Sequence, residues 1–133
     1  MKKIRVLIGM LGLDQHEVGA IAVSRMLRDA GLEVIYAGKF NTLDMLVKTG
    51  MEENVDLIGL SCHSWEYIHY IPELFRIMQE NDFEIPVVAG GSVITPADAE
   101  DLLKKGVAAA FGSSSTPSEI IKRIRELVES APG

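Results

Sequence analysis

The chain has 133 residues, of which 47% are hydrophobic and 24% charged, and this balance predicts one folded domain with its own core, residues 1–133. The formal net charge is −6 at pH 7 and no dense cluster of lysine and arginine is present, which argues against nucleic acid as a partner. With one cysteine, no signal-peptide pattern and no apolar stretch long enough to span a membrane, a cytoplasmic protein is expected.

Short apolar segments alternate with segments of helical periodicity along the whole chain. In chain order we expect a strand at 4–8, a helix at 18–30, a strand at 33–37, a helix at 43–53, a strand at 56–60, a helix at 65–81, a strand at 85–89, a helix at 98–105, a strand at 107–111 and a last helix that opens at 116–119. No long linker or internal repeat interrupts this alternation.

Alternating strands and helices predict an α/β fold, with a five-stranded parallel sheet covered by helices on both faces. The flavodoxin-like strand order 2-1-3-4-5 is expected. In such a sheet, ligands bind outside the carboxyl ends of the strands, at the point where the strand order reverses. The candidate site therefore lies in four loops, at residues 9–18, 61–64, 90–96 and 112–116.

The first of these loops places a carboxylate, Asp14, two residues before an imidazole, His16. A histidine that binds a metal through one ring nitrogen usually donates its other N–H to a carboxylate, so the two residues can act as a pair. The alternative is that Asp14 caps the following helix and His16 is a solvated loop residue. A zinc site built from protein ligands needs three or four of them, whereas a metal held in a macrocycle needs only one.

The other loops are rich in small residues. Gly90, Gly91 and Ser92 follow the fourth expected strand, residues 112–115 after the fifth are Gly-Ser-Ser-Ser, and Ser61 follows the third. Glycine at a strand end lets the backbone approach a bulky planar ligand, although a tight turn alone would also explain it. Together these loops predict a slot lined by small side chains.

The spacing Asp14-x-His16-x-x-Gly19, followed by Ser61 and then by Gly90-Gly91, resembles the D-x-H-x-x-G, S-x-L and G-G signature of cobalamin-binding domains. The resemblance spans roughly residues 3–127 and is greatest to the small subunit of adenosylcobalamin-dependent acyl-CoA mutases of the methylmalonyl-CoA mutase type. It implies an isomerase subunit that uses adenosylcobalamin. It also implies a larger TIM-barrel partner subunit that binds the CoA thioester, without which the chain is inactive.

The resemblance further implies base-off, His-on binding, in which the dimethylbenzimidazole tail leaves cobalt and His16 takes its place as the lower ligand. Asp14 would be the hydrogen-bond partner of His16, and the tail would enter a slot beside the sheet. The implied cofactor-binding residues are Asp14, Gln15, His16, Glu17, Val18, Gly19, Ser61, His63, Gly90, Gly91, Phe111, Gly112 and Ser115, with His16 as the metal ligand.

The chain departs from the mutase pattern at two places. Met10 stands where the mutases usually carry lysine, and Ser61-Cys62-His63 replaces S-x-L. A buried thiol is favoured over a zinc site at Cys62 and His63, because adjacent residues seldom point at one ion. These changes indicate a divergent branch with another substrate or partner, and Trp65 is a candidate partner contact.

Other classes with this strand order fit less well. A phosphoacceptor receiver domain needs an aspartate at the end of the third strand, where Ser61 stands, and a flavodoxin needs a Ser/Thr-rich phosphate loop after the first. A corrinoid methyl carrier, a B12-sensing regulator and an interaction module that has lost cobalamin stay open as alternatives.

Overall fold

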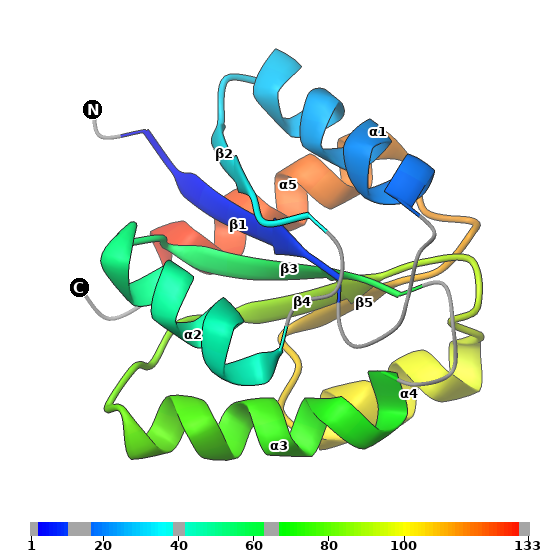
Figure 1. Cartoon of the computed structure of the whole chain (residues 1–133). Coiled ribbons are helices and arrows are strands. Elements are labelled where there is room, and N and C mark those ends of the chain that lie inside the picture. Colours follow the sequence, from blue (N-terminus) through cyan, green and yellow to red (C-terminus); the bar gives the residue numbers. More distant parts are fainter. Residues whose placement is uncertain (1–2, 11–16, 39–41, 63–66, 131–133) are drawn as a thin grey trace.

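The computed structural model describes residues 3–10, 17–38, 42–62 and 67–130, and within them strands and helices alternate strictly (Figure 1). The strands are β1 Arg5–Gly9, β2 Glu33–Tyr36, β3 Leu57–Ser61, β4 Val87–Gly90 and β5 Ala109–Phe111. The helices are α1 Glu17–Asp29, α2 Leu43–Glu52, α3 Tyr67–Glu80, α4 Pro96–Lys104 and α5 Pro117–Glu129. None of the helices in these ranges is long and apolar enough to cross a membrane.

The five strands form one parallel sheet in the order β2-β1-β3-β4-β5, which confirms the flavodoxin-like prediction. The central register aligns Ile8 with Gly59 and Gly59 with Val88. Because every strand runs in the same direction, all five carboxyl ends lie at one edge of the sheet (Figure 1). The strand order reverses between β1 and β3, and a crevice is expected there.

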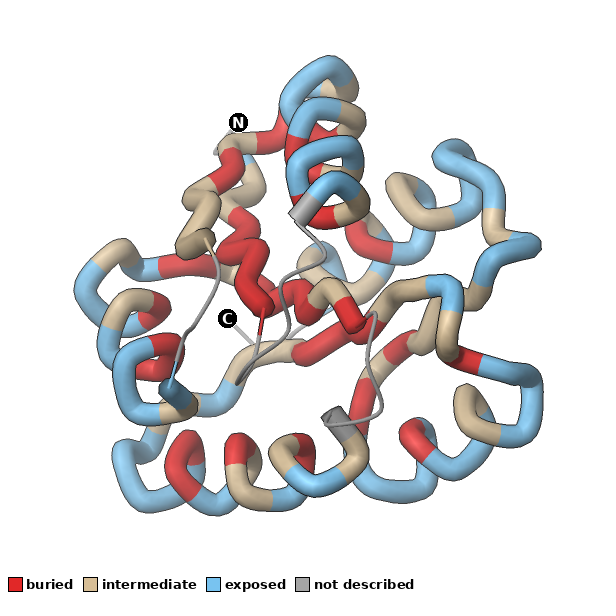
Figure 2. The backbone as a smooth tube through the Cα atoms, turned by 45° about the vertical axis from the view of Figure 1, so that its right-hand side comes forward, coloured by how far each residue is buried: buried red, intermediate tan, exposed pale blue. Residues whose placement is uncertain are grey.

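Each face of the sheet has its own core. Successive residues of a strand point to opposite faces, so Leu7 joins the core under α2, α3 and α4 while Val6 and Ile8 join the core under α1 and α5. Figure 1 shows the two helices of the second face above the sheet and the other three below it, and Figure 2 shows the buried strands between their half-exposed helices. The domain is therefore a three-layer sandwich.

Helix α4 begins two residues before the expected start at 98. Thr95 is its N-cap: its side-chain oxygen accepts the N–H of Asp98 at 3.1 Å, and the Asp98 carboxylate accepts the N–H of Thr95 at 3.1 Å. This reciprocal capping box, with Pro96 in the first turn, fixes the start of the helix.

Each strand differs from its expected range by one or two residues at one or both ends, and hydrogen bonds explain the difference for β5 and β4. Strand β5 begins at Ala109 instead of 107, because the Val107 N–H donates to the Leu102 carbonyl and so closes the end of α4. Strand β4 extends to Gly90, whose carbonyl accepts the N–H of Cys62 at 2.7 Å. The fourth strand therefore carries its glycine within the sheet and not after it.

Candidate functional site

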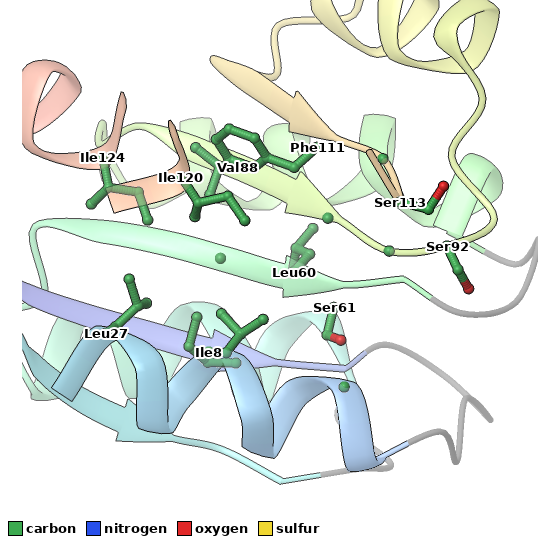
Figure 3. A pocket seen from close by; sticks show the side chains of 16 residues that line it. Ile8, Leu27, Leu60, Ser61, Val88, Ser92, Phe111, Ser113, Ile120 and Ile124 are labelled. Carbon is green, nitrogen blue, oxygen red and sulfur yellow. The ribbon is translucent and has the colours of Figure 1, made fainter. Parts of the chain in front are cut away.

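A cavity of about 200 Å³ lies between the sheet and the helices α1 and α5 (Figure 3). We call it the α1–α5 cavity. Its floor is formed where β3 and β4 present Gly59, Ser61 and Gly90 to this face, and its walls come from β1, β5 and the two helices. In Figure 3 the serines Ser61 and Ser113 mark its end at the carboxyl edge of the sheet.

The cavity exists because two neighbouring strands lack side chains at this depth. A Cβ atom at Gly59 would lie 2.8 Å from Cδ1 of Ile8, so a larger residue would fill the space that Ile8 and the cavity now share. A Cβ atom at Gly90 would have only Phe111 within 4 Å, at 3.7 Å, and would otherwise project into open space. Glycine inside a strand marks such places of close approach.

The mouth of the cavity is shaped by backbone contacts between strand ends. A Cβ atom at Gly91 would lie 1.6 Å from the carbonyl oxygen of Cys62, and one at Gly112 would lie 2.8 Å from the carbonyl oxygen of Ile94. The Gly91 N–H donates to the Phe111 carbonyl at 3.0 Å. These glycines hold the ends of β3, β4 and β5 together and leave no room for any side chain.

The two helices present matching apolar ridges to the cavity. Val23 and Leu27 of α1 and Ile120 and Ile124 of α5 are each spaced four residues apart, which places each pair on one face of its helix. The guanidinium of Arg125 donates to the Ala30 carbonyl at 2.7 Å and so joins α5 to the end of α1. This bond links the two helices that form the walls of the cavity.

The lining changes in character along the cavity. Leu27 and Ile124 lie at its inner end, while the hydroxyls of Ser61, Ser92 and Ser113 lie at the carboxyl edge (Figure 3). Sites for drug-sized ligands measure about 300–1,000 Å³, so this cavity accepts one part of a large ligand and not the whole. The cavity therefore has an apolar interior behind a mouth that carries three hydroxyls.

The structure brings together six of the residues expected at the site, and they line the cavity: Gly19, Ser61, Gly90, Gly91, Phe111 and Gly112. Two others do not line it. Val18 is 83% exposed at the start of α1, and Ser115 lies in a turn in which its N–H donates to the Gly112 carbonyl at 3.2 Å.

The remaining expected residues fall where the structure gives no side chain. Asp14, Gln15, His16 and His63 lie outside the described residues, as does Trp65, and of Glu17 only the backbone is described, as the first residue of α1. The roles expected for them stay predictions.

Sequence reasoning missed the helical walls and Gly59. The signals were present, since Gly59 interrupts an otherwise apolar strand and Val23, Leu27, Ile120 and Ile124 have regular helical spacing. Such spacing also occurs in helices that only fill a core, and here the same four residues border an open space. Whether such residues fill a core or border a cavity depends on the distance between the helices, which cannot be read from the sequence.

Of the two departures from the mutase pattern, Met10 is described, whereas His63, which stands at the leucine position of S-x-L, lies outside the described residues. Met10 is fully buried in the core under α1 and α5, and Cys62 is 2% exposed with its Sγ 3.7 Å from the Leu60 carbonyl oxygen. Cys62 is thus the buried thiol that was expected. Among the described residues, no three His, Cys, Asp or Glu side chains are placed to hold a metal ion.

Comparison with known proteins agrees with this geometry. The B12 binding domain family matches residues 4–122. The chain is 38% identical over 125 residues to the 2-hydroxyisobutanoyl-CoA mutase small subunit of Aquincola tertiaricarbonis, covering 94% of this chain and 92% of that one. It is 33% identical over 127 residues to the pivalyl-CoA mutase small subunit of Xanthobacter autotrophicus, covering 95% and 84%.

A solved structure shares the fold. The crystal structure of a cobalamin-binding protein from Desulfitobacterium hafniense DCB-2 superposes with a TM-score of 0.79 at 19% identity, covering 95% of this chain and 60% of that chain. The family match covers most of the chain, and its residues include both glycine-lined strand ends of the cavity. The chain therefore belongs to the family of B12-binding domains, and its sequence is similar to the small subunits of acyl-CoA mutases.

Proposed function

We propose that this chain is the cobalamin-binding small subunit of an adenosylcobalamin-dependent acyl-CoA mutase. The observation that carries the proposal is the α1–α5 cavity, an apolar space of about 200 Å³ that reaches the carboxyl edge of the sheet. The segment that joins β1 to α1 carries Asp14 and His16, and Gly19, three residues after His16, lines the cavity. A single ligand can therefore contact the segment that joins β1 to α1 and also enter the cavity.

The residues present fit the lower half of a cobalamin. The cavity is too small for a corrin ring but suits the bicyclic base of the nucleotide tail, with Gly90 leaving open space where a side chain would project. His16 would ligate cobalt in place of that base. Asp14 would accept the other ring N–H of His16, which fixes the tautomer and raises the basicity of the ligating nitrogen.

When bound, adenosylcobalamin supplies a cobalt–carbon bond whose homolysis starts a radical rearrangement of a carbon skeleton. The contribution of this chain is to hold and orient the cofactor. Buried Ile8, Leu27 and Ile124 keep water from the tail, and the serines at the mouth can hydrogen-bond its polar linker. These residues bind the cofactor from one side only.

The other face would be covered by a larger partner subunit of TIM-barrel fold that binds the CoA thioester. Both similar relatives are named as small subunits, of mutases that act on two different acyl-CoA compounds. We propose that the acyl group is selected by the partner and that the assembled enzyme works in the cytoplasm. The substrate class is therefore an acyl-CoA thioester whose carbon skeleton is isomerised.

Electron paramagnetic resonance of the Co(II) form tests the mode of binding. Protein carrying nitrogen-15 in its histidine rings is mixed with cobalamin and reduced, and hyperfine coupling from one histidine nitrogen is expected. His16→Ala should abolish that coupling, whereas His69→Ala, which removes an exposed histidine of α3, should leave it unchanged. Coupling from the dimethylbenzimidazole nitrogen, or no binding of cobalamin, would contradict the proposal.

A further inference from the structure

We propose that the α1–α5 cavity selects among cobamides by the polarity of their lower base, accepting apolar rings and rejecting purines. The inference rests on the proposed function, because it takes the cavity as the place of the nucleotide tail. It goes beyond that function by assigning a specificity to the inner lining, which the binding signature does not include.

The side chains of the inner cavity offer no hydrogen bond. Ile8, Leu27, Val88 and Ile124 are hydrocarbon side chains no more than 5% exposed, and they face the cavity from both the sheet and the helices (Figure 3). Among the described lining residues, the only polar side chains are Ser61, Ser92 and Ser113. All three lie at the carboxyl edge, away from Leu27 and Ile124 (Figure 3).

The backbone of the floor is also engaged. Gly59 exposes its main chain to the cavity, but the strand that carries it is paired on both sides, with Ile8 in β1 and Val88 in β4. The N–H and C=O groups of a paired strand point along the sheet toward its neighbours and not out of its face. The floor is therefore an apolar surface despite having no side chain.

A lower base that enters this space must leave behind the water bonded to its outer edge. The outer edge of dimethylbenzimidazole carries only ring hydrogens and methyl groups, whereas adenine carries ring nitrogens and an amino group there. Each polar group buried without a partner costs enough free energy to weaken binding about tenfold or more. The cavity should consequently prefer dimethylbenzimidazole or a cresol ether over adenine.

Affinities of wild-type protein for four corrinoids give the first measurement. The probes are cobamides whose lower base is dimethylbenzimidazole, p-cresol or adenine, together with cobinamide, which has no base. The cresol compound has no coordinating nitrogen, so it separates the polarity of the ring from the ease with which a base leaves cobalt. We expect the cresol and dimethylbenzimidazole compounds to bind at least about tenfold more tightly than the adenine compound.

A matched pair of variants on β4 locates the selectivity. Val88→Thr places a hydroxyl in the cavity, and Val87→Thr places the same hydroxyl in the opposite core, with Val87 1% and Val88 5% exposed. Val88→Thr should reduce the ratio of the affinities for the dimethylbenzimidazole and adenine compounds about threefold or more, because the hydroxyl can form a hydrogen bond with the purine. Val87→Thr should leave that ratio unchanged. Ile120→Thr places a hydroxyl in the cavity from α5, where Ile120 is half-buried, and the same reduction as for Val88→Thr is expected. Circular dichroism checks that each variant folds.

The outcomes separate this inference from the proposed function. Equal binding of the cresol and adenine compounds by the wild type would overturn the inference while leaving cobalamin binding intact. An unchanged preference in both Val88→Thr and Ile120→Thr would also overturn it, because the discrimination would then arise elsewhere. Binding of none of the four corrinoids would overturn the proposed function, and the inference with it.

Discussion

Added Cβ atoms distinguish two adjacent glycines at the cavity. At Gly91 the atom would lie 1.6 Å from the Cys62 carbonyl oxygen, so the close approach of β3 and β4 excludes a side chain altogether. At Gly90 it would meet only Phe111, at an ordinary 3.7 Å, and would point into the α1–α5 cavity. We infer that Gly91 is required by the fold and Gly90 by the ligand.

This distinction yields a prediction at the residue scale. Gly90→Val should fold, bind cobalamin at least about tenfold more weakly because its branches occupy the cavity, and bind the tail-less cobinamide almost normally. Gly91→Ala should lower the free energy of unfolding by more than about 3 kcal/mol. Ordinary overpacking costs about 1–3 kcal/mol, and the cost is greater here because the Cys62 carbonyl oxygen belongs to the backbone and cannot move away as a side chain would. Titration with both corrinoids and thermal unfolding measure these effects. Equal losses for cobalamin and cobinamide in Gly90→Val would show that Gly90 serves the fold instead.

At the scale of the elements, three helices begin with a threonine N-cap at the carboxyl edge of the sheet. Thr42, Thr95 and Thr116 each accept a backbone N–H from the third residue of the helix that follows. Of these three caps, that of α4 is reciprocal, because the Asp98 carboxylate also accepts the N–H of Thr95. Helix α4 follows the loop that carries Gly91 and Ser92, two residues that line the cavity.

Removal of that cap should cost measurable stability. Thr95→Ala is expected to lower the free energy of unfolding by about 1 kcal/mol, because it leaves the N–H of Asp98 without its side-chain acceptor. Asp98→Ala should cost a similar amount through the loss of the other half of the capping box. Urea unfolding of the two single variants and the double variant is the measurement. Because both residues form one motif, the double variant should lose less than the sum of the single losses, and simple additivity would contradict a coupled box.

On the scale of the whole molecule, the two edges of the sheet differ. The amino edge carries ion pairs and a hydrogen bond: the Arg5 guanidinium lies 3.1 Å from the Glu33 carboxylate and 3.6 Å from that of Glu53, and the Arg5 backbone N–H donates to the Asp56 carboxylate at 2.9 Å. The carboxyl edge carries the mouth of the cavity and the exposed Val18 at the start of α1. We therefore expect the partner subunit to dock at the carboxyl edge.

At this scale we predict that catalysis requires both subunits. The chain alone, loaded with adenosylcobalamin, should not isomerise an acyl-CoA, and turnover should appear when the larger subunit is added. Trp65→Ala should weaken assembly more than cobalamin binding, because aromatic side chains often anchor interfaces. Titration of the larger subunit against both proteins, with turnover and cobalamin affinity as separate readouts, is the measurement. Turnover by the small chain alone would refute the two-subunit assignment.

The sequence by itself determined the alternation of elements, the parallel sheet, its strand order and the edge of the sheet at which the cavity opens. These follow from local signals, because apolar strands and amphipathic helices have different periods and a right-handed crossover leaves few ways to arrange them. The spacing of Asp14, His16, Gly19, Ser61, Gly90 and Gly91 also identified the family, which the family comparison then confirmed. Element ends were less certain where hydrogen bonds between segments set them, as for Val107 and the end of α4.

Only the tertiary structure decided which small residues keep the cavity open and which hold the strands together. Gly90 and Gly91 look alike in the sequence, but one faces open space and the other faces the carbonyl oxygen of Cys62, which directly follows β3 nearly thirty residues earlier in the chain. In the same way, Leu27 and Ile124 lie almost a hundred residues apart in the sequence and meet across the cavity only because α1 and α5 cover the same face of the sheet. An empty space is a property of the distance between elements, and no single residue encodes that distance.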